Sequence, residues 1–348
     1  SSMNSKISGT DGRYSYARGL GAEIPGSQNE LVAAKKGTTV RLTIDRDVQW
    51  VAANAIQEAV SKAHAVSGTV IVMDPKTGHI LAHATAPTFD PNNTKTVSES
   101  LMRNPSVQDI YEPGSTGKVM TLAAALEEKK ITPETVLTVP YSIKRGGDTF
   151  HDHERHPVQK LTTSGILAVS SNTGTIKIGE MLSNDTLHDY LSKFGIGKST
   201  GSGLPGESAG ILRPVSDWSG TTAPTVAFGQ GYSLTAMQAT SIFATIANDG
   251  VRVSPTVIAG TSDASGKFTA SSARTNERVI SATTAQQLRI MMESVVSGQG
   301  TAPSAAVPGY RVAGKTGTAM RFNSELRKYS GYTASFIGFA PADAPKYV

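Results

Sequence analysis

The sequence contains no cysteine among its 348 residues. Disulfide bonds, cysteine-ligated zinc and a cysteine nucleophile are therefore excluded, and the composition fits an oxidising compartment. The sequence also lacks any run of 18 apolar residues, the length that a bilayer-spanning helix needs. The chain starts with Ser1, Ser2 and Met3 and shows no signal-peptide pattern, which would fit a protein whose upstream anchor has been removed.

A concentrated block of positive charge is missing as well. The formal net charge is +5, but the Lys and Arg residues are scattered along the chain. A nucleic-acid-binding protein usually gathers its basic residues on one helix or stripe, so we do not expect nucleic acid as a partner. A mildly basic surface is compatible with work near an anionic membrane or cell wall.

What the sequence does contain is regular periodicity from about residue 38 onwards. Residues 1–36 are polar and rich in Gly and Ser, and we interpret them as a linker or as the remnant of a non-catalytic N-terminal module. Asp45 or Asp47 is placed to cap a helix. The pattern predicts a strand, that helix and a hairpin in succession, at residues 38–44, 48–60 and 69–84.

The rest of the chain predicts several helices and then strands. Residues 86–108 show no period and are expected to form a loop. We expect an α+β fold over residues 37–348, in which the first and last parts share an antiparallel sheet flanked by helices and the middle forms a mainly helical lobe. A site is expected in the cleft between sheet and lobe. The predicted elements are helices at 115–130, 163–183, 186–194, 235–248 and 283–296, and strands at 310–320 and 333–340.

The first chemical motif is Ser115-Thr116-Gly117-Lys118. Ser115 is predicted at a helix N-terminus, where unpaired N–H groups and the helix dipole favour developing negative charge. Lys118 follows three residues later and shares a helical face with Ser115. A lysine made neutral by burial or by a second cation can take the proton of a serine. Taken alone, the pattern is better explained by a capping serine followed by a surface lysine.

The second motif is Ser170-Ser171-Asn172. Small residues crowd a predicted helix here and lower its helix propensity. The Ser170 hydroxyl could relay a proton, and the Asn172 amide could bind a substrate amide through both its donor and its acceptor. An ordinary polar kink between two helical segments is the alternative interpretation.

The third motif is Lys315-Thr316-Gly317-Thr318, on a predicted strand. A glycine within a strand lets another backbone approach, as a peptide pairing with a sheet edge would. The threonine hydroxyls and the lysine cation suit a carboxylate. A glycine-rich turn next to a strand is the alternative interpretation.

In this order the three motifs match the set found in β-lactamases and penicillin-binding proteins. The sequence resembles the class B penicillin-binding proteins, which are monofunctional transpeptidases, and among them the septal cell-division type. Roughly residues 37–348 carry the resemblance, which implies the penicillin-binding-protein/serine β-lactamase-like transpeptidase fold. Because that family continues with more sheet and a terminal helix, we expect the C-terminal end to be truncated. The supporting segments are Glu112-Pro113-Gly114-Ser115, residues 228–235 and residues 337–341.

The resemblance also implies a role for each motif residue. Ser115 would attack the carbonyl of a D-alanyl-D-alanine stem peptide, with Lys118 as its base. Ser170 would pass the proton to the leaving nitrogen, helped by Lys315. The substrate would be bound by the side chain of Asn172, which would hold the acyl-chain amide, and by Thr316, Gly317 and Thr318, with the backbone N–H groups of Ser115 and Thr318 as the oxyanion hole.

The same resemblance implies partners and a location. Peptidoglycan stem peptides would be the substrates and β-lactam antibiotics the covalent inhibitors. Cell-division membrane proteins, including a glycosyltransferase, would be partners on the extracytoplasmic face of the cytoplasmic membrane. The mechanism requires no cofactor and no metal.

Two other functions stay open. One is hydrolysis, as a D,D-carboxypeptidase or a serine β-lactamase, and the other is a non-catalytic division scaffold or β-lactam sensor. Glu180 and Asn184 copy the spacing of a β-lactamase deacylating loop. We interpret them as surface residues, because Glu180 follows Asn172 on the same predicted helix. This interpretation, together with Ser171 where the β-lactamase motif has Asp, argues against hydrolysis of the acyl-enzyme.

The segment from His151 to His156 has a spacing that resembles that of metal ligands. It contains three histidines and two acidic residues within six positions. It also lies in a loop-like stretch, and acyl transfer needs no metal. We therefore interpret these histidines as solvated or hydrogen-bonded loop residues.

Overall fold

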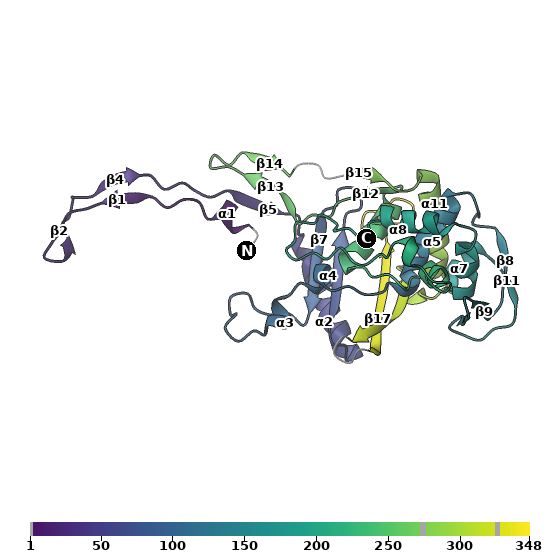
Figure 1. Cartoon of the computed structure of the whole chain (residues 1–348). Helices are drawn as coiled ribbons and strands as arrows, with labels where there is room; N and C mark the ends of the chain where they lie inside the picture. Colours follow the sequence, from purple (N-terminus) through teal and green to yellow (C-terminus); the bar gives the residue numbers. More distant parts are fainter. Residues whose placement is uncertain (1–2, 272–275, 324–327) are drawn as a thin grey trace. The chain divides into compact units, whose positions relative to one another are not determined.

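The computed structural model describes residues 3–271, 276–323 and 328–348, coloured along the chain in Figure 1. The chain divides into two compact units. The smaller comprises residues 1–43 and 256–273, and the larger comprises residues 44–255 and 274–348. All of the candidate site residues lie in the larger unit.

The smaller unit consists of short strands that bury little. Its central strand is β13 (Ile258–Ser262), which pairs with β5 (Thr39–Leu42) on one side and β14 (Phe268–Ala270) on the other. The predicted strand near residue 40 is thus confirmed. The other elements were not predicted, because segments of two to four residues are too short to show a period. They are α1 (Asn4–Ile7), the pair β1 (Arg13–Ser15) and β4 (Asn29–Val32), and the pair β2 (Arg18–Gly19) and β3 (Ala22–Glu23).

The larger unit begins with α2 (Arg46–Ala63), which packs on the hairpin of β6 (Gly68–Met73) and β7 (Ile80–Ala86). Asp45 caps the helix, because its Oδ1 accepts the backbone N–H groups of Asp47 and Val48 at 3.0 and 3.1 Å. The predicted cap, helix and hairpin are all confirmed.

The helical part of this unit is built around α5 (Lys118–Glu127). Residues 118–126 are all buried, as expected for a helix that is apolar on every side. Helices α7, α8 and α11 pack against it (Figure 1). The other helices of the unit are α3 (Glu99–Met102), α4 (Pro105–Gln108), η1 (Gly114–Gly117), α6 (Thr163–Ala168), α7 (Asn172–Gly179), α8 (Asn184–Lys193), η2 (Val215–Asp217), α9 (Thr222–Ala227), α10 (Ala236–Ala247), α11 (Ala282–Val296) and η3 (Pro303–Ala305).

Several elements differ from the expectation. The stretch 86–108 contains the short helices α3 and α4, and the single helix expected over 163–183 is divided into α6 and α7. Three strand pairs were not predicted, because each strand is only three or four residues long. These are β8 (Val136–Val139) with β11 (Gln159–Thr162), β9 (Ser142–Arg145) with β10 (Asp148–His151), and β12 (Val251–Val253) with β15 (Asn276–Arg278).

The last strands, β16 (Ala313–Asn323) and β17 (Lys328–Phe339), pair antiparallel and confirm the two strands predicted near the end. The expected sheet joining the first and last parts is not continuous, since β6–β7 and β16–β17 are separate two-stranded sheets. Tyr347 forms a bridge to Ala340 beside β17, and Val348 exchanges two backbone hydrogen bonds of 2.9 Å with Met73 in β6. A cavity of about 480 Å³ lies between the two hairpins and α10.

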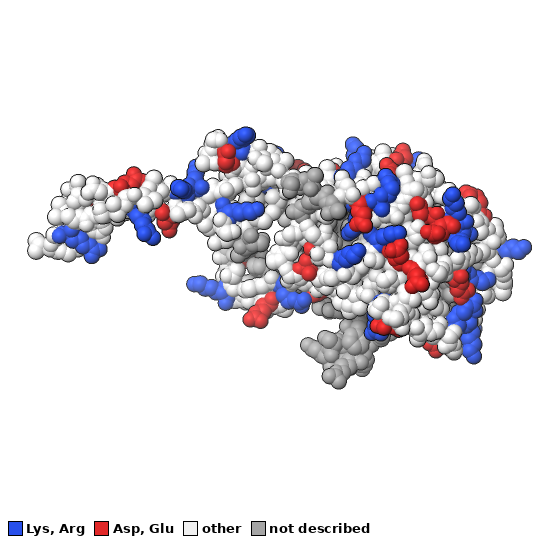
Figure 2. Space-filling model, turned by 45° about the horizontal axis from the view of Figure 1, so that its top comes forward, with Lys and Arg blue, Asp and Glu red and all other residues white. Residues whose placement is uncertain are grey.

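The surface and the helices add two observations. On the face shown in Figure 2, Lys and Arg side chains are interspersed with Asp and Glu over the larger unit. Among the described residues, no helix is both long enough and apolar enough to cross a membrane.

Candidate active site

Ser115 lies in η1, a 3₁₀ turn that leads directly into α5. The backbone N–H of Lys118 donates to the carbonyl of Ser115, so the two residues are one turn apart. Ser115 is half-buried, whereas Lys118 is completely buried. The Thr116 hydroxyl donates to the carbonyl of Pro113 at 2.8 Å and tightens the turn. The structure therefore places Ser115 at a helix start, as the sequence indicated.

Gly117 of the first motif serves close packing. A Cβ built on it would lie 2.2 Å from the hydroxyl of Tyr232 and 2.9 Å from the Cα of Gly229. Tyr232 is 1% exposed, and its hydroxyl has no hydrogen-bond partner among the described residues. Burial raises the pKa of Tyr232. A side chain at position 117 would push the 228–235 segment away from the Ser115 turn.

The two motif lysines converge on Ser170. Lys315 Nζ donates to Ser170 Oγ at 2.9 Å, and Lys118 Nζ lies 3.3 Å from the same oxygen. The Lys118 ammonium also donates to the Ser170 carbonyl. These groups come from α5, from the α6–α7 junction and from β16, which are far apart in the chain. Two lysine side chains that are 197 positions apart in the chain thus contact one hydroxyl.

Ser170 occupies an unusual backbone conformation. Its φ is +59°, in the left-handed region, where a residue with a Cβ is uncommon. It separates the end of α6 from Ser171, which is the N-cap of α7 and accepts the N–H of Gly174 at 2.9 Å. The kink turns both the hydroxyl and the carbonyl of Ser170 towards Lys118.

Strand β16 lies against the Ser115 turn through two glycines. A Cβ on Gly317 would lie 2.8 Å from Thr116 Cγ2 and 2.9 Å from the Pro113 carbonyl. A Cβ on Gly114 would lie 2.9 Å from the carbonyl of Thr318. Glycine at both positions therefore brings the backbone of Thr318 next to the turn that carries Ser115.

The environment of the two lysines favours their neutral forms. Burial is the main cause that holds the pKa of Lys118 well below its ordinary value, and the charge of Lys315 adds to this. Burial lowers the pKa of Lys315 to about 7. Both shifts have the sign expected when an ammonium group loses its water. A lysine that is neutral near neutral pH can act as a general base.

The remaining motif side chains surround this centre. Asn172 is half-buried, and its Nδ2 donates to the carbonyl of His151 at 3.0 Å. The Thr316 hydroxyl lies 2.8 Å from that of Thr301 and 3.4 Å from Lys315 Nζ. Thr318 is exposed. The structure thus gathers the three motifs in one place, while contacts of Asn172, Thr316, Gly317 and Thr318 with a substrate stay predictions.

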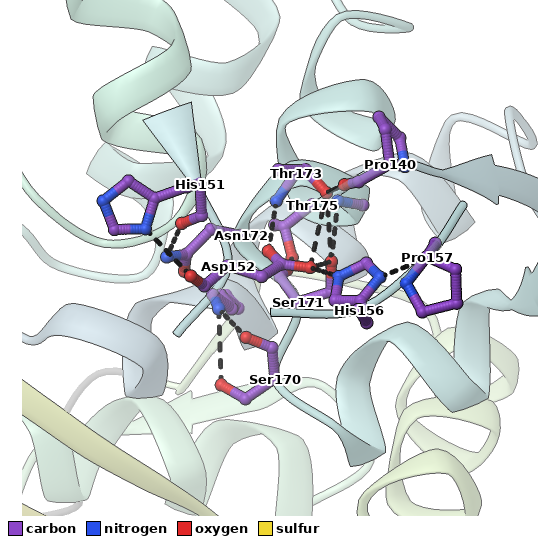
Figure 3. A network of polar contacts seen from close by, with 12 residues as sticks. Pro140, His151, Asp152, His156, Pro157, Ser170, Ser171, Asn172, Thr173 and Thr175 are labelled. Carbon is purple, nitrogen blue, oxygen red and sulfur yellow. Dashed lines mark hydrogen bonds and ion pairs between the residues drawn. The ribbon is translucent and has the colours of Figure 1, made fainter. Parts of the chain in front are cut away.

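Sequence reasoning missed Asp152 as part of this site. Asp152 directly follows β10 and is 6% exposed. Its contacts are drawn in Figure 3. Its Oδ1 accepts the backbone N–H of Thr173 at 2.9 Å, and its Oδ2 accepts the hydroxyl of Ser171 at 2.7 Å. Its negative charge raises the pKa of Lys118 and so opposes the effect of burial. The available signal was the segment from His151 to His156, which the sequence analysis weighs as a metal site and interprets as loop residues.

The structure also places the two segments that the sequence analysis interprets as outside the chemistry. Glu180 directly follows α7, and its carboxylate pairs with the guanidinium of Arg145, with a distance of 3.1 Å from Nη2 to Oε2. His151 and His156 are hydrogen-bonded to backbone carbonyls of their own loop. Among the described residues, no group of three or more His, Cys, Asp or Glu side chains is arranged to hold a metal ion.

The sequence matches the family of the penicillin binding protein transpeptidase domain over residues 68–348. The chain belongs to that family. It is 42% identical to the penicillin-binding protein PbpB of Mycobacterium tuberculosis, over all of this chain and 53% of that protein. It is 34% identical to the peptidoglycan D,D-transpeptidase FtsI of Escherichia coli, over 88% of this chain and 50% of that protein. The chain thus spans about half the length of these curated relatives.

Solved structures agree with this family membership and with the fold. Penicillin-binding protein 3 from Mycobacterium tuberculosis, in complex with ampicillin, has a TM-score of 0.91 at 40% identity, covering 99% of this chain and 75% of that one. The complex of the same protein with aztreonam gives a TM-score of 0.88 at 38% identity, with 99% and 81% coverage. The predicted α+β transpeptidase fold and the class B resemblance are therefore confirmed.

Proposed function

We propose that this penicillin-binding protein is a peptidoglycan D,D-transpeptidase that works through an acyl-enzyme on Ser115, in septal cell-wall synthesis. One observation carries the proposal. Two lysine side chains with lowered pKa values, from α5 and β16, meet at the Ser170 hydroxyl beside the turn that carries Ser115. A surface lysine and a capping serine would not produce such a cluster.

In the first half-reaction, neutral Lys118 takes the proton of the Ser115 hydroxyl as Oγ bonds to the carbonyl carbon of the penultimate D-alanine. The backbone N–H groups of Ser115 and Thr318 hold the oxyanion, an interaction worth about 3–4 kcal/mol per donor in a comparable enzyme. The C–N bond then breaks. Ser170 gives its hydroxyl proton to the leaving nitrogen under the field of Lys315 and takes in its place the proton that Lys118 holds, and D-alanine departs.

In the second half-reaction, the amine of another stem peptide attacks the Ser115 ester. A new amide bond forms, the C–O bond to Ser115 breaks, and the proton returns from the amine to Oγ through the same groups. The product is a cross-link and the enzyme is regenerated. A β-lactam would acylate Ser115 in the same way, but its ring-opened leaving group stays attached and the acyl-enzyme persists.

Substrate contacts follow from the placement of the other motif residues. Asn172 is proposed to hold the acyl-chain amide, while Thr316, Gly317 and Thr318 line the strand on which the terminal carboxylate would lie. The names of the relatives support this reading, since one is called a D,D-transpeptidase and another is a complex with ampicillin.

The setting of the enzyme is part of the proposal. We place the catalytic domain at residues 37–348, outside the cytoplasmic membrane, with residues 1–36 as the last part of a non-catalytic N-terminal module. Cell-division membrane proteins, including a glycosyltransferase, are the proposed partners. No nucleic acid, metal or cofactor enters the mechanism.

Intact mass spectrometry after incubation with a fluorescent penicillin tests the nucleophile. We expect one covalent adduct, which peptide mapping places on Ser115. The Ser115→Ala variant should form none, whereas Ser142→Ala, an exposed serine on β9, should react like the wild type. An adduct on any other residue would contradict the assignment.

A thioester stem-peptide analogue separates the competing functions. With a D-amino acid as acceptor, a transpeptidase should form the transfer product, and its penicillin adduct should last far longer than seconds. Hydrolysis alone with loss of the adduct within seconds would favour a carboxypeptidase or β-lactamase. Equal turnover by the wild type and Ser115→Ala would instead favour a binding module.

A further inference from the structure

His156 lies between two hydrogen-bond acceptors. Its Nε2 is 2.9 Å from Asp152 Oδ2, and its Nδ1 is 2.7 Å from the carbonyl of Pro157 (Figure 3). Neither a carboxylate nor a peptide carbonyl carries a hydrogen to donate. Both ring nitrogens must therefore donate, and only the doubly protonated imidazolium has two N–H groups. The geometry assigns a charge to this histidine.

The Asp152 carboxylate that His156 contacts also accepts hydrogen bonds from other groups. Asp152 accepts the backbone N–H of Thr173 on Oδ1 and the hydroxyl of Ser171 on Oδ2. Thr173 and Ser171 belong to the first turn and the cap of α7, where the helix dipole also favours a negative charge. An imidazolium paired with a carboxylate therefore stands at the start of this helix.

This pair is connected to the proposed catalytic segment. Asp152 holds the residues on both sides of Asn172, and the preceding carbonyl of His151 accepts the Asn172 amide at 3.0 Å. Ser170, whose hydroxyl meets both lysines, directly precedes Ser171. His151 and Asp152 thus hold three consecutive residues, Ser171, Asn172 and Thr173. Asp152 is held in turn by His156.

We propose that His156 is a positioning residue that, as an imidazolium, holds Asp152 and through it the Ser170–Asn172 segment in register with Lys118 and Lys315. The proposal rests on the proposed function, because it assigns His156 to the service of that chemistry. His156 itself touches neither the substrate nor the reacting atoms. When its proton leaves, one of its two hydrogen bonds must be lost, and the segment loosens.

The neighbouring charges set the direction of the pH dependence. Hydrogen bonds to Pro157 and Asp152 raise the pKa of His156 above its ordinary value. The other groups nearby are the guanidinium of Arg155, which lies over the Tyr141 ring at 5.7 Å, and His151, whose ring stacks on Tyr141 at the same distance. The edge of Tyr141 faces His156 at 6.0 Å, and Lys118 lies beyond Asp152.

The sign of the effect follows from linkage. The histidine has a higher pKa in the folded than in the unfolded chain, where it is about 6.5. Its stabilisation is therefore complete below about pH 6.5 and is lost as the pH rises through the folded value. Acylation should lose the benefit of His156 over the same interval.

Nuclear magnetic resonance of the whole chain with ¹⁵N-labelled histidine tests the charge directly, with His156→Gln used for assignment. We expect both ring nitrogens to carry protons at pH 6 and the apparent pKa to exceed 6.5. In Asp152→Asn the amide can donate to Nε2, so the pKa should fall by at least about one unit. A neutral tautomer at pH 6 in the wild type would overturn the proposal.

The positioning role is tested by the pH profile of penicillin acylation. We expect His156→Gln to react about three- to tenfold more slowly than the wild type at pH 6, with the ratio approaching one above the His156 pKa. His153→Gln, an exposed histidine on the same loop, should match the wild type throughout. A ratio for His156→Gln that is independent of pH, or equal to one at pH 6, would overturn the role.

A readout without penicillin keeps the two proposals distinguishable. The backbone amide shifts of Ser170 and Asn172 should titrate with the His156 pKa in the wild type and not in His156→Gln. If they do so while the wild type forms no penicillin adduct, the proposed function fails and the coupling of His156 to this segment stands. If the adduct forms but these amides do not follow His156, the positioning proposal fails alone.

Discussion

The lysine side and the histidine side of the site handle positive charge in opposite ways. Lys118 and Lys315 are buried, and burial lowers both of their pKa values. His156 is 17% exposed in its side chain, has a carboxylate at 2.9 Å, and its pKa is raised. Both sides reach the Ser170–Asn172 segment. Within one site, the fold disfavours the charged form of two lysines and favours the charged form of a histidine.

The difference lies in the hydrogen-bond partners of each basic group. The hydrogen bonds of the lysines go to hydroxyl and carbonyl oxygens, which cannot repay the lost hydration of an ammonium group. The imidazolium keeps some water and has a full negative charge as its partner. A general base needs the first environment, and a structural tie needs the second.

Replacing Lys118 should have the largest effect on this comparison. Lys118→Met keeps most of the volume but removes the proposed base, so acylation by penicillin should fall about 10²- to 10⁴-fold. The melting temperature should stay the same or rise, because a buried amine, which is costly to remove from water, has been replaced by an apolar chain. Stopped-flow acylation and thermal unfolding measure the two quantities.

The control for this variant is Lys144→Met, which removes an exposed lysine on β9. It should acylate like the wild type. If Lys118→Met kept its acylation rate within tenfold of the wild type, Lys118 would not be the base. The lowered pKa of Lys118 would then have no role in the proposed acylation.

A pair of variants sharpens the comparison through stability. Wild-type Lys315, with a pKa of about 7, destabilises the fold as the pH falls from about 10.4 through 7, so Lys315→Met should gain stability most at low pH. His156→Gln should lose stability most at low pH. At pH 5.5 the two melting temperatures should move in opposite directions, each by about 2 °C or more. Shifts of the same sign would contradict the assigned charges.

The smallest expected effect concerns Glu180. Its ion pair with Arg145 leaves the two side chains 37% and 39% exposed, and such pairs contribute about 0–1 kcal/mol. Glu180→Ala should therefore change neither the lifetime of the penicillin adduct nor the unfolding temperature appreciably. A tenfold change in the deacylation rate would restore the β-lactamase interpretation of this segment.

Local sequence signals were sufficient for the long elements, whereas the candidate site residues were singled out by the family resemblance. The periodic apolar residues of α2, α10 and α11 predicted each helix because each element is long enough for several turns. Ser115, Lys118, Ser170 and Lys315 were found because a resemblance ties their three motifs together. No property of the separate tetrapeptides would have established that Lys118 and Lys315 share one hydroxyl.

Long-range contacts explain what was missed. Asp152 was visible only as part of a hexapeptide, and its importance depends on Ser171 and Thr173, which approach it from another segment. The expected continuous sheet depended on which strand edges meet, and alternation within a strand does not encode that. The interruption at Ser170 was not predicted either, because a left-handed conformation is uncommon for a residue with a Cβ and its contacts with both lysines come from distant segments.

The left-handed conformation of Ser170 sets thermal stability and chemical activity against each other, although protein engineers usually pursue both together. At φ +59° a glycine or asparagine would fit the backbone with less strain than Ser170 does. A sequence optimised only for thermal resistance would drift towards such a replacement and discard the hydroxyl. High thermal stability of the folded chain therefore gives no assurance that the proposed acylation chemistry has survived.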